Sequence, residues 1–129
     1  MSSSTRKKIL CVEDHTDSGV LVGFILSKEG YEVITAEAGE EGLRLAKGEK
    51  FDLFIFDIWL PGISGIELCR KIREFNQETP IIFYTALAFE ADRQNGLSAG
   101  AQAYLIKPDD TQHLLTTVET LLKKEPRAT

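Results

Sequence analysis

Acidic, hydroxyl and ammonium side chains follow four of the hydrophobic runs in this 129-residue chain. The run KILCVED ends on Glu13 and Asp14, FDLFIFD ends on Asp57, IIFYT ends on Thr85 and AYLIK ends on Lys107. Parallel strands of one open sheet would bring these five residues to the same edge, where such sheets bind their ligands. We therefore expect three carboxylates, a hydroxyl and an ammonium to converge in one cleft.

This set of side chains suits the transfer of a phosphoryl group. Three neighbouring carboxylates raise one another's pKa unless a cation balances their charge. Mg²⁺ (or Mn²⁺) would meet that need, because hard cations prefer carboxylate and phosphate oxygens. A carboxylate can also act as a nucleophile and become an aspartyl phosphate. We expect the metal, Lys107 and Thr85 to neutralise and orient a phosphoryl group around Asp57.

Five short apolar runs alternate with five segments of helical periodicity. The runs cover residues 8–13, 31–35, 52–57, 80–84 and 102–106, and the helical segment at 89–99 has the weakest periodicity. Consecutive apolar residues at 53–56 are typical of a strand that is covered on both faces. The alternation predicts an α/β fold, a flavodoxin-like (βα)₅ doubly wound parallel sheet with strand order 2-1-3-4-5. Its switch point, between the first and third strands, is where the carboxylates would meet.

Composition predicts one globular domain over residues 8–123, between a disordered polar and basic tail at 1–7 and a C-terminal tail at 124–129. The net charge of −5 argues against direct nucleic-acid binding. No apolar stretch approaches the ~20 residues that span a membrane, so we expect no membrane insertion and a cytoplasmic protein. Cys11 and Cys69 have no metal-binding or redox spacing, and we expect both to be reduced and structural.

Four motifs carry a family resemblance: the acidic pair in VEDH, the stretch FDLFIFDIWLPGISG, the dipeptide Thr85-Ala86 and the stretch GAQAYLIKP. In this order and spacing they are highly specific, and the chain resembles the receiver domain of two-component response regulators from Lys8 to about Lys123. The resemblance implies a signalling domain rather than an enzyme. Such a domain catalyses at most its own phosphorylation and slow dephosphorylation.

The resemblance also implies a role for each site residue. Asp57 would be the phosphoacceptor, taking its phosphoryl group from a phosphohistidine of a histidine kinase or phosphotransfer protein. Asp14 and Asp57 would bind the metal directly and Glu13 through water, while the backbone carbonyl of Trp59 would complete the protein's ligands. Lys107 would contact the acyl phosphate.

Three further residues complete the implied site: Pro108, expected to follow a cis peptide bond, and the switch pair Thr85 and Tyr104. Phosphorylation would switch the surface formed by residues 89–122 of the last two helices and the last strand. An unidentified downstream effector protein would read that surface, and a homodimer could form through it. Whether the chain is free-standing or part of a longer protein stays open.

Several residues depart from the family pattern or invite other roles. Trp59 and Leu87, two positions after Asp57 and Thr85, are large and apolar and should exclude the water that hydrolyses the acyl phosphate. This predicts slow dephosphorylation, with a partner-binding surface role for Trp59 as the equal alternative. We expect Asp109-Asp110 to cap the last helix and His15 to be a solvated loop residue.

Three other functions are weighed against the receiver. A phosphatase of the haloacid-dehalogenase type needs a second aspartate two residues after the nucleophile, where this chain has Trp59. A flavodoxin-like cofactor site needs a hydroxyl- or glycine-rich phosphate loop, whereas the residues after the first run include carboxylates. A receiver-like interaction module that acts without phosphorylation remains the alternative.

Overall fold

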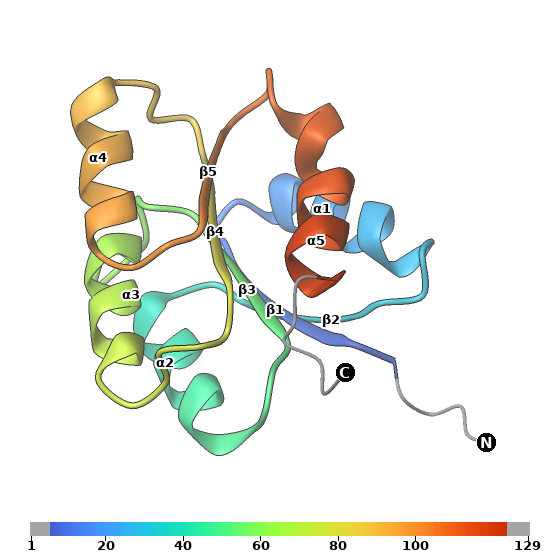
Figure 1. Cartoon of the computed structure of the whole chain (residues 1–129), viewed down its shortest axis with the longest axis horizontal. Helices are drawn as coiled ribbons and strands as arrows, with labels where there is room; N and C mark the ends of the chain where they lie inside the picture. Colours follow the sequence, from blue (N-terminus) through green and yellow to red (C-terminus); the bar gives the residue numbers. More distant parts are fainter. Residues whose placement is uncertain (1–5, 124–129) are drawn as a thin grey trace.

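The computed structural model describes residues 6–123 as parallel strands that alternate with helices (Figure 1). The strands are β1 (Lys8–Val12), β2 (Glu32–Ala36), β3 (Leu53–Phe56), β4 (Ile81–Thr85) and β5 (Ala103–Ile106). The helices are α1 (Thr16–Ser27), α2 (Gly39–Gly48), α3 (Gly65–Arg73), α4 (Glu90–Ser98) and α5 (Leu114–Lys123), and a short 3-10 helix, η1 (Thr111–His113), precedes α5. Each predicted strand is confirmed to within one residue at either end.

The strand order β2-β1-β3-β4-β5 confirms the doubly wound, flavodoxin-like topology. β1 and β3 are neighbours, with Val12 opposite Phe56. Glu13 and Asp57 therefore leave two adjacent strands at the same level. The amide of Asp57 donates to the carbonyl of Val12 (3.0 Å), which carries the pairing one residue beyond β3.

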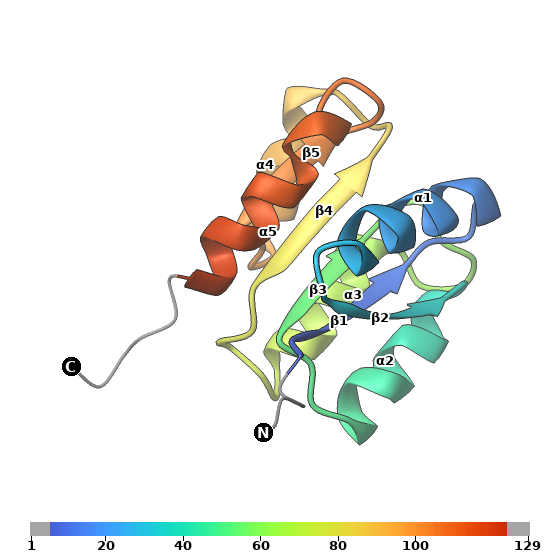
Figure 2. The same ribbon diagram turned by 90° about the vertical axis from the view of Figure 1, so that its right-hand side faces the viewer.

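Alternation along the strands divides the core into two layers. Leu10 and Val12 belong to the hydrophobic cluster that α2 and α3 cover, whereas Ile9 and Cys11 belong to the cluster under α1 and α5. Figure 2 shows α1 and α5 on one face of the sheet, with α2, α3 and α4 behind it. Since every central strand is covered on both faces, its sequence reads as an unbroken apolar run.

The helices are held to the sheet in different ways. α3 begins with Ser64 as its N-cap, and the Ser64 hydroxyl accepts a hydrogen bond from the amide of Glu67 (3.1 Å). α4 buries only Gly96, and a Cβ there would lie 3.0 Å from Phe83 and 3.1 Å from Tyr104. α4 thus packs through its backbone, which explains why its sequence lacks a strong apolar period.

The prediction that Asp109-Asp110 caps the last helix is wrong. η1 separates the pair from α5, and the carboxylate of Asp110 instead accepts a hydrogen bond from the amide of Ile106 (2.9 Å). Asp110 therefore closes the turn that follows β5. Its side chain is drawn backward to a strand amide, so it does not reach the free amides of the helix.

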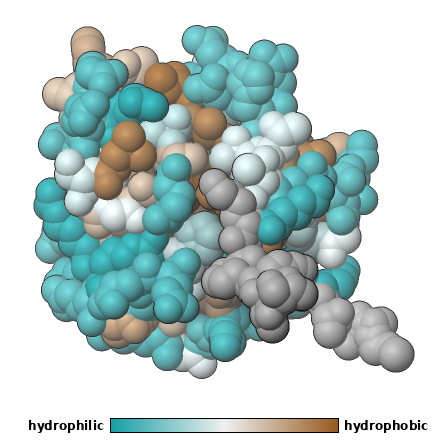
Figure 3. Space-filling view, in the orientation of Figure 1, coloured by the Kyte–Doolittle hydropathy of each residue, from teal (hydrophilic) through white to brown (hydrophobic). Residues whose placement is uncertain are grey.

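The predicted terminal segments at 1–7 and 124–129 lie outside the described residues, apart from Arg6 and Lys7. The carbonyl of Lys7 accepts a hydrogen bond from the amide of Glu32 (2.9 Å). None of the described helices is long and apolar enough to cross a lipid bilayer. The face in Figure 3 is mainly hydrophilic and carries small, separate hydrophobic areas.

Replacing Gly65 with alanine should destabilise the fold. A Cβ at this first residue of α3 would lie 2.0 Å from the carbonyl oxygen of Asp57, a backbone atom that cannot move aside cheaply. We expect Gly65→Ala to lower the free energy of unfolding by about 3 kcal/mol, as overpacking does. Urea titration of the two proteins measures this difference.

Gly23→Ala is the matched control. Gly23 lies inside α1, and nothing comes within 4 Å of a Cβ there. Alanine should raise the free energy of unfolding by up to about 1 kcal/mol, because glycine is the poorer helix former. Equal effects of the two substitutions would contradict the close contact at Gly65.

Both cysteines should be unreactive in the folded protein. Cys11 and Cys69 are free and buried. Burial raises the pKa of Cys11 to about 12 and that of Cys69 to about 11. Because the thiolate is the reactive form, a chromogenic disulfide reagent at pH 8 should modify no thiol in the native protein and both thiols in denaturant. Rapid modification of either thiol in the native protein would contradict this.

Candidate active site

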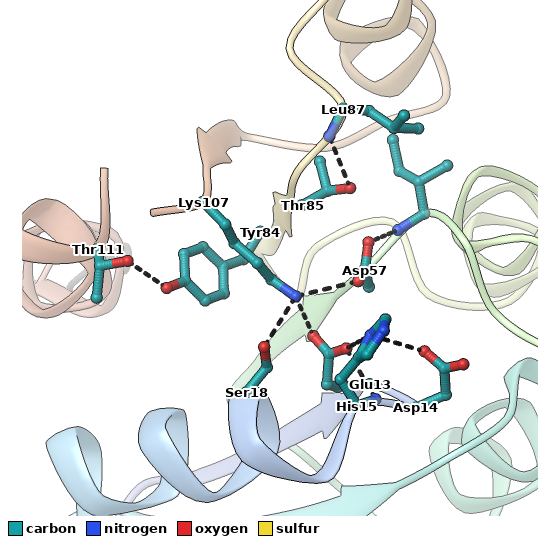
Figure 4. A network of polar contacts seen from close by, with 11 residues as sticks. Glu13, Asp14, His15, Ser18, Asp57, Tyr84, Thr85, Leu87, Lys107 and Thr111 are labelled. Carbon is teal, nitrogen blue, oxygen red and sulfur yellow. Dashed lines mark hydrogen bonds and ion pairs between the residues drawn. The ribbon is translucent and has the colours of Figure 1, made fainter. Parts of the chain in front are cut away.

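The ammonium of Lys107 joins three strands and a helix at the carboxyl edge of the sheet (Figure 4). Its Nζ lies 2.6 Å from Glu13 Oε1, 3.1 Å from Asp57 Oδ2 and 3.3 Å from Ser18 Oγ. Lys107 follows β5, whereas these partners follow β1 and β3 or lie on α1. One flexible side chain thus crosses the end of β4 to reach the switch point of the sheet.

Both carboxylate oxygens of Asp57 have a donor. Oδ1 accepts a hydrogen bond from the amide of Ile58 (2.6 Å), and Oδ2 faces the Lys107 ammonium. The Asp57 side chain is only 6% exposed. Charge-assisted hydrogen bonds from two sides fix the plane of this carboxylate.

Of the acidic pair after β1, Glu13 is buried and Asp14 is accessible to solvent. The Glu13 side chain is 4% exposed, and its Oε2 accepts a hydrogen bond from the amide of His15 (3.1 Å). The Asp14 side chain is 36% exposed. The His15 imidazole is exposed, as expected for a loop residue, yet its Nδ1 lies 3.2 Å from Glu13 and 3.3 Å from Asp14.

Negative charge exceeds positive charge in this cleft. Burial lowers the pKa of Lys107, but the hydrogen bond to Glu13 and the charges of Asp57 and Glu13 outweigh it, so the pKa is raised above its ordinary value. Lys107 therefore remains an ammonium at neutral pH. One ammonium faces the three carboxylates of Glu13, Asp14 and Asp57, so the cleft attracts a further cation.

The donor atoms in the cleft fit a hard divalent cation. Ligand atoms of Glu13, Asp14, His15 and Asp57 lie within 4.8 Å of one another. Carboxylate oxygens dominate this set, which suits Mg²⁺ or Mn²⁺ better than a soft metal. Trp59 lies in the loop after β3 and is 72% exposed, as a residue outside the core is.

Thr85 and Tyr104 meet at the backbone of Leu87. The Thr85 hydroxyl, buried at the end of β4, accepts a hydrogen bond from the Leu87 amide (3.3 Å). The hydroxyl of Tyr104 donates to the Leu87 carbonyl (2.8 Å). Tyr104 is therefore turned inward, and burial raises its pKa to about 12. The peptide bond between Lys107 and Pro108 is cis.

The fold thus brings Glu13, Asp14, Asp57 and Lys107 into one cluster, while Thr85 is joined to Leu87 beside it. The sequence analysis missed two neighbours of Lys107. Ser18 lies in the first turns of α1, and the ring of Tyr84 lies 5.3 Å from Nζ. A polar residue one turn into the helix after the acidic pair was the available signal for Ser18. Tyr84 lies in an apolar run, and no sequence signal distinguishes it from an ordinary core residue of a strand.

Comparison with known proteins gives a consistent result. A family model described as the response regulator receiver domain matches residues 9–119. Response regulator ArlR of Staphylococcus aureus is 40% identical over 120 residues, which cover 93% of this chain and 54% of ArlR. The chain therefore spans about half the length of the curated relatives it matches.

Solved structures agree over nearly the whole chain. A CheY-like receiver domain protein from Methanospirillum hungatei superposes with a TM-score of 0.88 at 36% identity, covering 93% of this chain and 96% of that one. Response regulator protein TrrA from Thermotoga maritima, in complex with Mg²⁺ and BeF, has a TM-score of 0.81 at 37% identity, covering 89% and 98%. The acidic cluster, the strand order and these matches together show that the chain belongs to the response regulator receiver domain family.

Proposed function

We propose that this receiver domain accepts a phosphoryl group on Asp57 from a phosphohistidine of a histidine kinase or phosphotransfer protein. The observation that carries the proposal is the environment of Asp57. Its buried carboxylate lies between the Lys107 ammonium and the Ile58 amide, beside the acidic pair Glu13 and Asp14. The Lys107 ammonium and a cation held by the acidic cluster would together offset the negative charge that repels an anionic phosphoryl group, and this supports nucleophilic attack by Asp57.

In the transfer, a carboxylate oxygen of Asp57 forms a bond to phosphorus as the phosphorus–nitrogen bond of the donor breaks. The donor imidazole leaves with the electron pair of that bond. Lys107, already 3.1 Å from Oδ2, neutralises charge on the phosphoryl oxygens as they approach. The Thr85 hydroxyl donates to one of these oxygens after transfer.

Asp14 and Asp57 would hold Mg²⁺ or Mn²⁺, with Glu13 acting through water and the Trp59 carbonyl as a further ligand. When bound, the metal supplies positive charge to the phosphoryl oxygens. Asp14 suits direct ligation because its side chain is open to solvent. Glu13 suits the indirect role, since one of its oxygens contacts Lys107 and the other accepts a hydrogen bond from the His15 amide.

The backbone of Leu87 links the proposed switch residues. A rotation of the Thr85 side chain toward a phosphoryl group would carry its hydroxyl away from the Leu87 amide, which now donates to it. Release of that amide would free the segment whose carbonyl accepts the Tyr104 hydroxyl. A charge change at Asp57 would thus reach α4, β5 and α5, the surface that we propose a downstream effector reads.

Receiver domains interact with histidine kinases and downstream effectors, and the proposed partners follow from this. Self-association through the α4-β5-α5 surface is a further proposal. The free, buried thiols of Cys11 and Cys69 support a cytoplasmic location, where thiols stay reduced. The alternative is an interaction module that acts without phosphorylation, and the next experiment separates the two.

Incubation with acetyl phosphate and Mg²⁺ should add one phosphoryl group, seen as a gain of about 80 Da in intact mass. Asp57→Ala should gain nothing, because the nucleophile is gone. EDTA should abolish the gain in the wild type by removing the metal. No gain in the wild type with any donor would favour the phosphorylation-independent module, and a gain in Asp57→Ala would mean that another residue accepts the group.

The acyl phosphate should be long-lived. Trp59 and Leu87 are apolar at the two positions that flank the path of hydrolytic water, so neither can orient it. We expect Trp59→Asn and Leu87→Asn each to shorten the lifetime several-fold, measured by the decay of phosphorylated mass. Phe89→Asn, which removes an exposed aromatic from the same loop as Leu87, is the control and should change nothing. A wild-type lifetime of seconds that Trp59→Asn leaves unchanged would refute this explanation.

A further inference from the structure

Tyr84 contacts Lys107 from the opposite side to the carboxylates. It is the residue before Thr85 in β4, and it is 3% exposed in the cluster beneath α1 and α5. The Lys107 ammonium lies over its ring, 5.3 Å from the centroid. Figure 4 shows the lysine side chain passing across the tyrosine ring on its way to Glu13 and Asp57.

The tyrosine ring differs in kind from the charged partners of Lys107. Glu13 and Asp57 are the groups whose charge a metal or a phosphoryl group would change. An aromatic ring attracts an ammonium through its quadrupole, and this attraction does not depend on the ionisation of Asp57. Two neutral groups contact Nζ: this buried ring and the hydroxyl of Ser18, which is 3.3 Å away.

The hydroxyl of Tyr84 contacts the segment that follows Lys107 in the sequence. It is hydrogen-bonded to the Thr111 hydroxyl at a distance of 2.5 Å. Thr111 begins η1, which leads directly into α5. Tyr84 therefore touches the loop after β5 at two points, through its ring at Lys107 and through its hydroxyl at Thr111.

We propose that Tyr84 is a positioning residue, which holds the Lys107 ammonium toward Asp57 and joins it to Thr111 before α5. The ring limits the directions open to a side chain with four rotatable bonds, and the hydroxyl fixes the ring. The kinetic consequence rests on the function proposed above, whereas the placement of Lys107 does not.

Placement of Lys107 is tested by NMR of protein with ¹³C-labelled lysine, assigned with Lys107→Arg. The ring current of Tyr84 should shift the ε-methylene protons of Lys107 upfield from those of the other lysines. Tyr84→Leu should return them to the common position, and Tyr84→Phe should largely keep the shift. An unshifted Lys107 signal in the wild type would overturn the proposal whatever the kinetics show.

Phosphoryl uptake from acetyl phosphate tests the effect on the reaction. We expect Tyr84→Leu to slow uptake roughly five- to tenfold, the size expected for losing a buried cation–π contact. Tyr84→Phe and Thr111→Val should each slow it less and by the same factor, and the double variant should be no slower than either. Tyr31→Phe, a partly buried tyrosine outside this contact, is the matched control and should behave as wild type.

The decisive comparison repeats Tyr84→Leu in a Lys107→Ala background. If Tyr84 acts through Lys107, the second substitution should add no further loss. An equal loss in both backgrounds would mean that Tyr84 only supports the fold, and uptake by Tyr84→Leu at the wild-type rate would also overturn the proposal. If the wild type takes up no phosphoryl group, the proposed function fails, and the NMR shift alone decides the placement of Lys107.

Discussion

Two buried carboxylates and one ammonium share the carboxyl edge of the sheet, and their ion pairs constrain everything placed around them. Glu13 and Asp57 are buried at the ends of adjacent strands, which is costly for like charges unless a partner reaches both. Lys107 supplies that partner from β5, across the intervening β4. The strand order and the turn closed by Asp110 together place the Lys107 ammonium between these two carboxylates.

Much of this arrangement could be predicted from the sequence because its signals are local. A strand covered on both faces must be apolar at consecutive positions, as residues 53–56 are, and a polar residue that ends such a run must lie at the sheet edge. Five such runs alternating with helices allow few topologies. Fold and charged cluster follow from pattern alone, whereas the assignment of roles within the cluster came from family resemblance.

The remaining features depend on contacts between segments far apart in sequence, and local patterns do not encode them. Tyr84 reads as an ordinary strand residue, and only its distances to Lys107 and Thr111 give it a further meaning. Aspartate is a residue type that often caps helices, but the carboxylate of Asp110 accepts a hydrogen bond from the strand amide of Ile106 instead. His15 is a solvated loop residue by pattern, and its ring still reaches both acidic neighbours.

The way α4 rests on the sheet has a consequence for its dynamics. The residue that α4 buries against Phe83 and Tyr104 is a glycine, so the helix itself contributes no fully buried apolar side chain to this contact. Segments with little buried apolar area open at the lowest free energy and exchange their amide hydrogens first. Of the described α-helices, α4 is the one that buries no side chain larger than glycine. The proposed output surface could therefore rearrange at α4 while the strands that hold Asp57 remain closed.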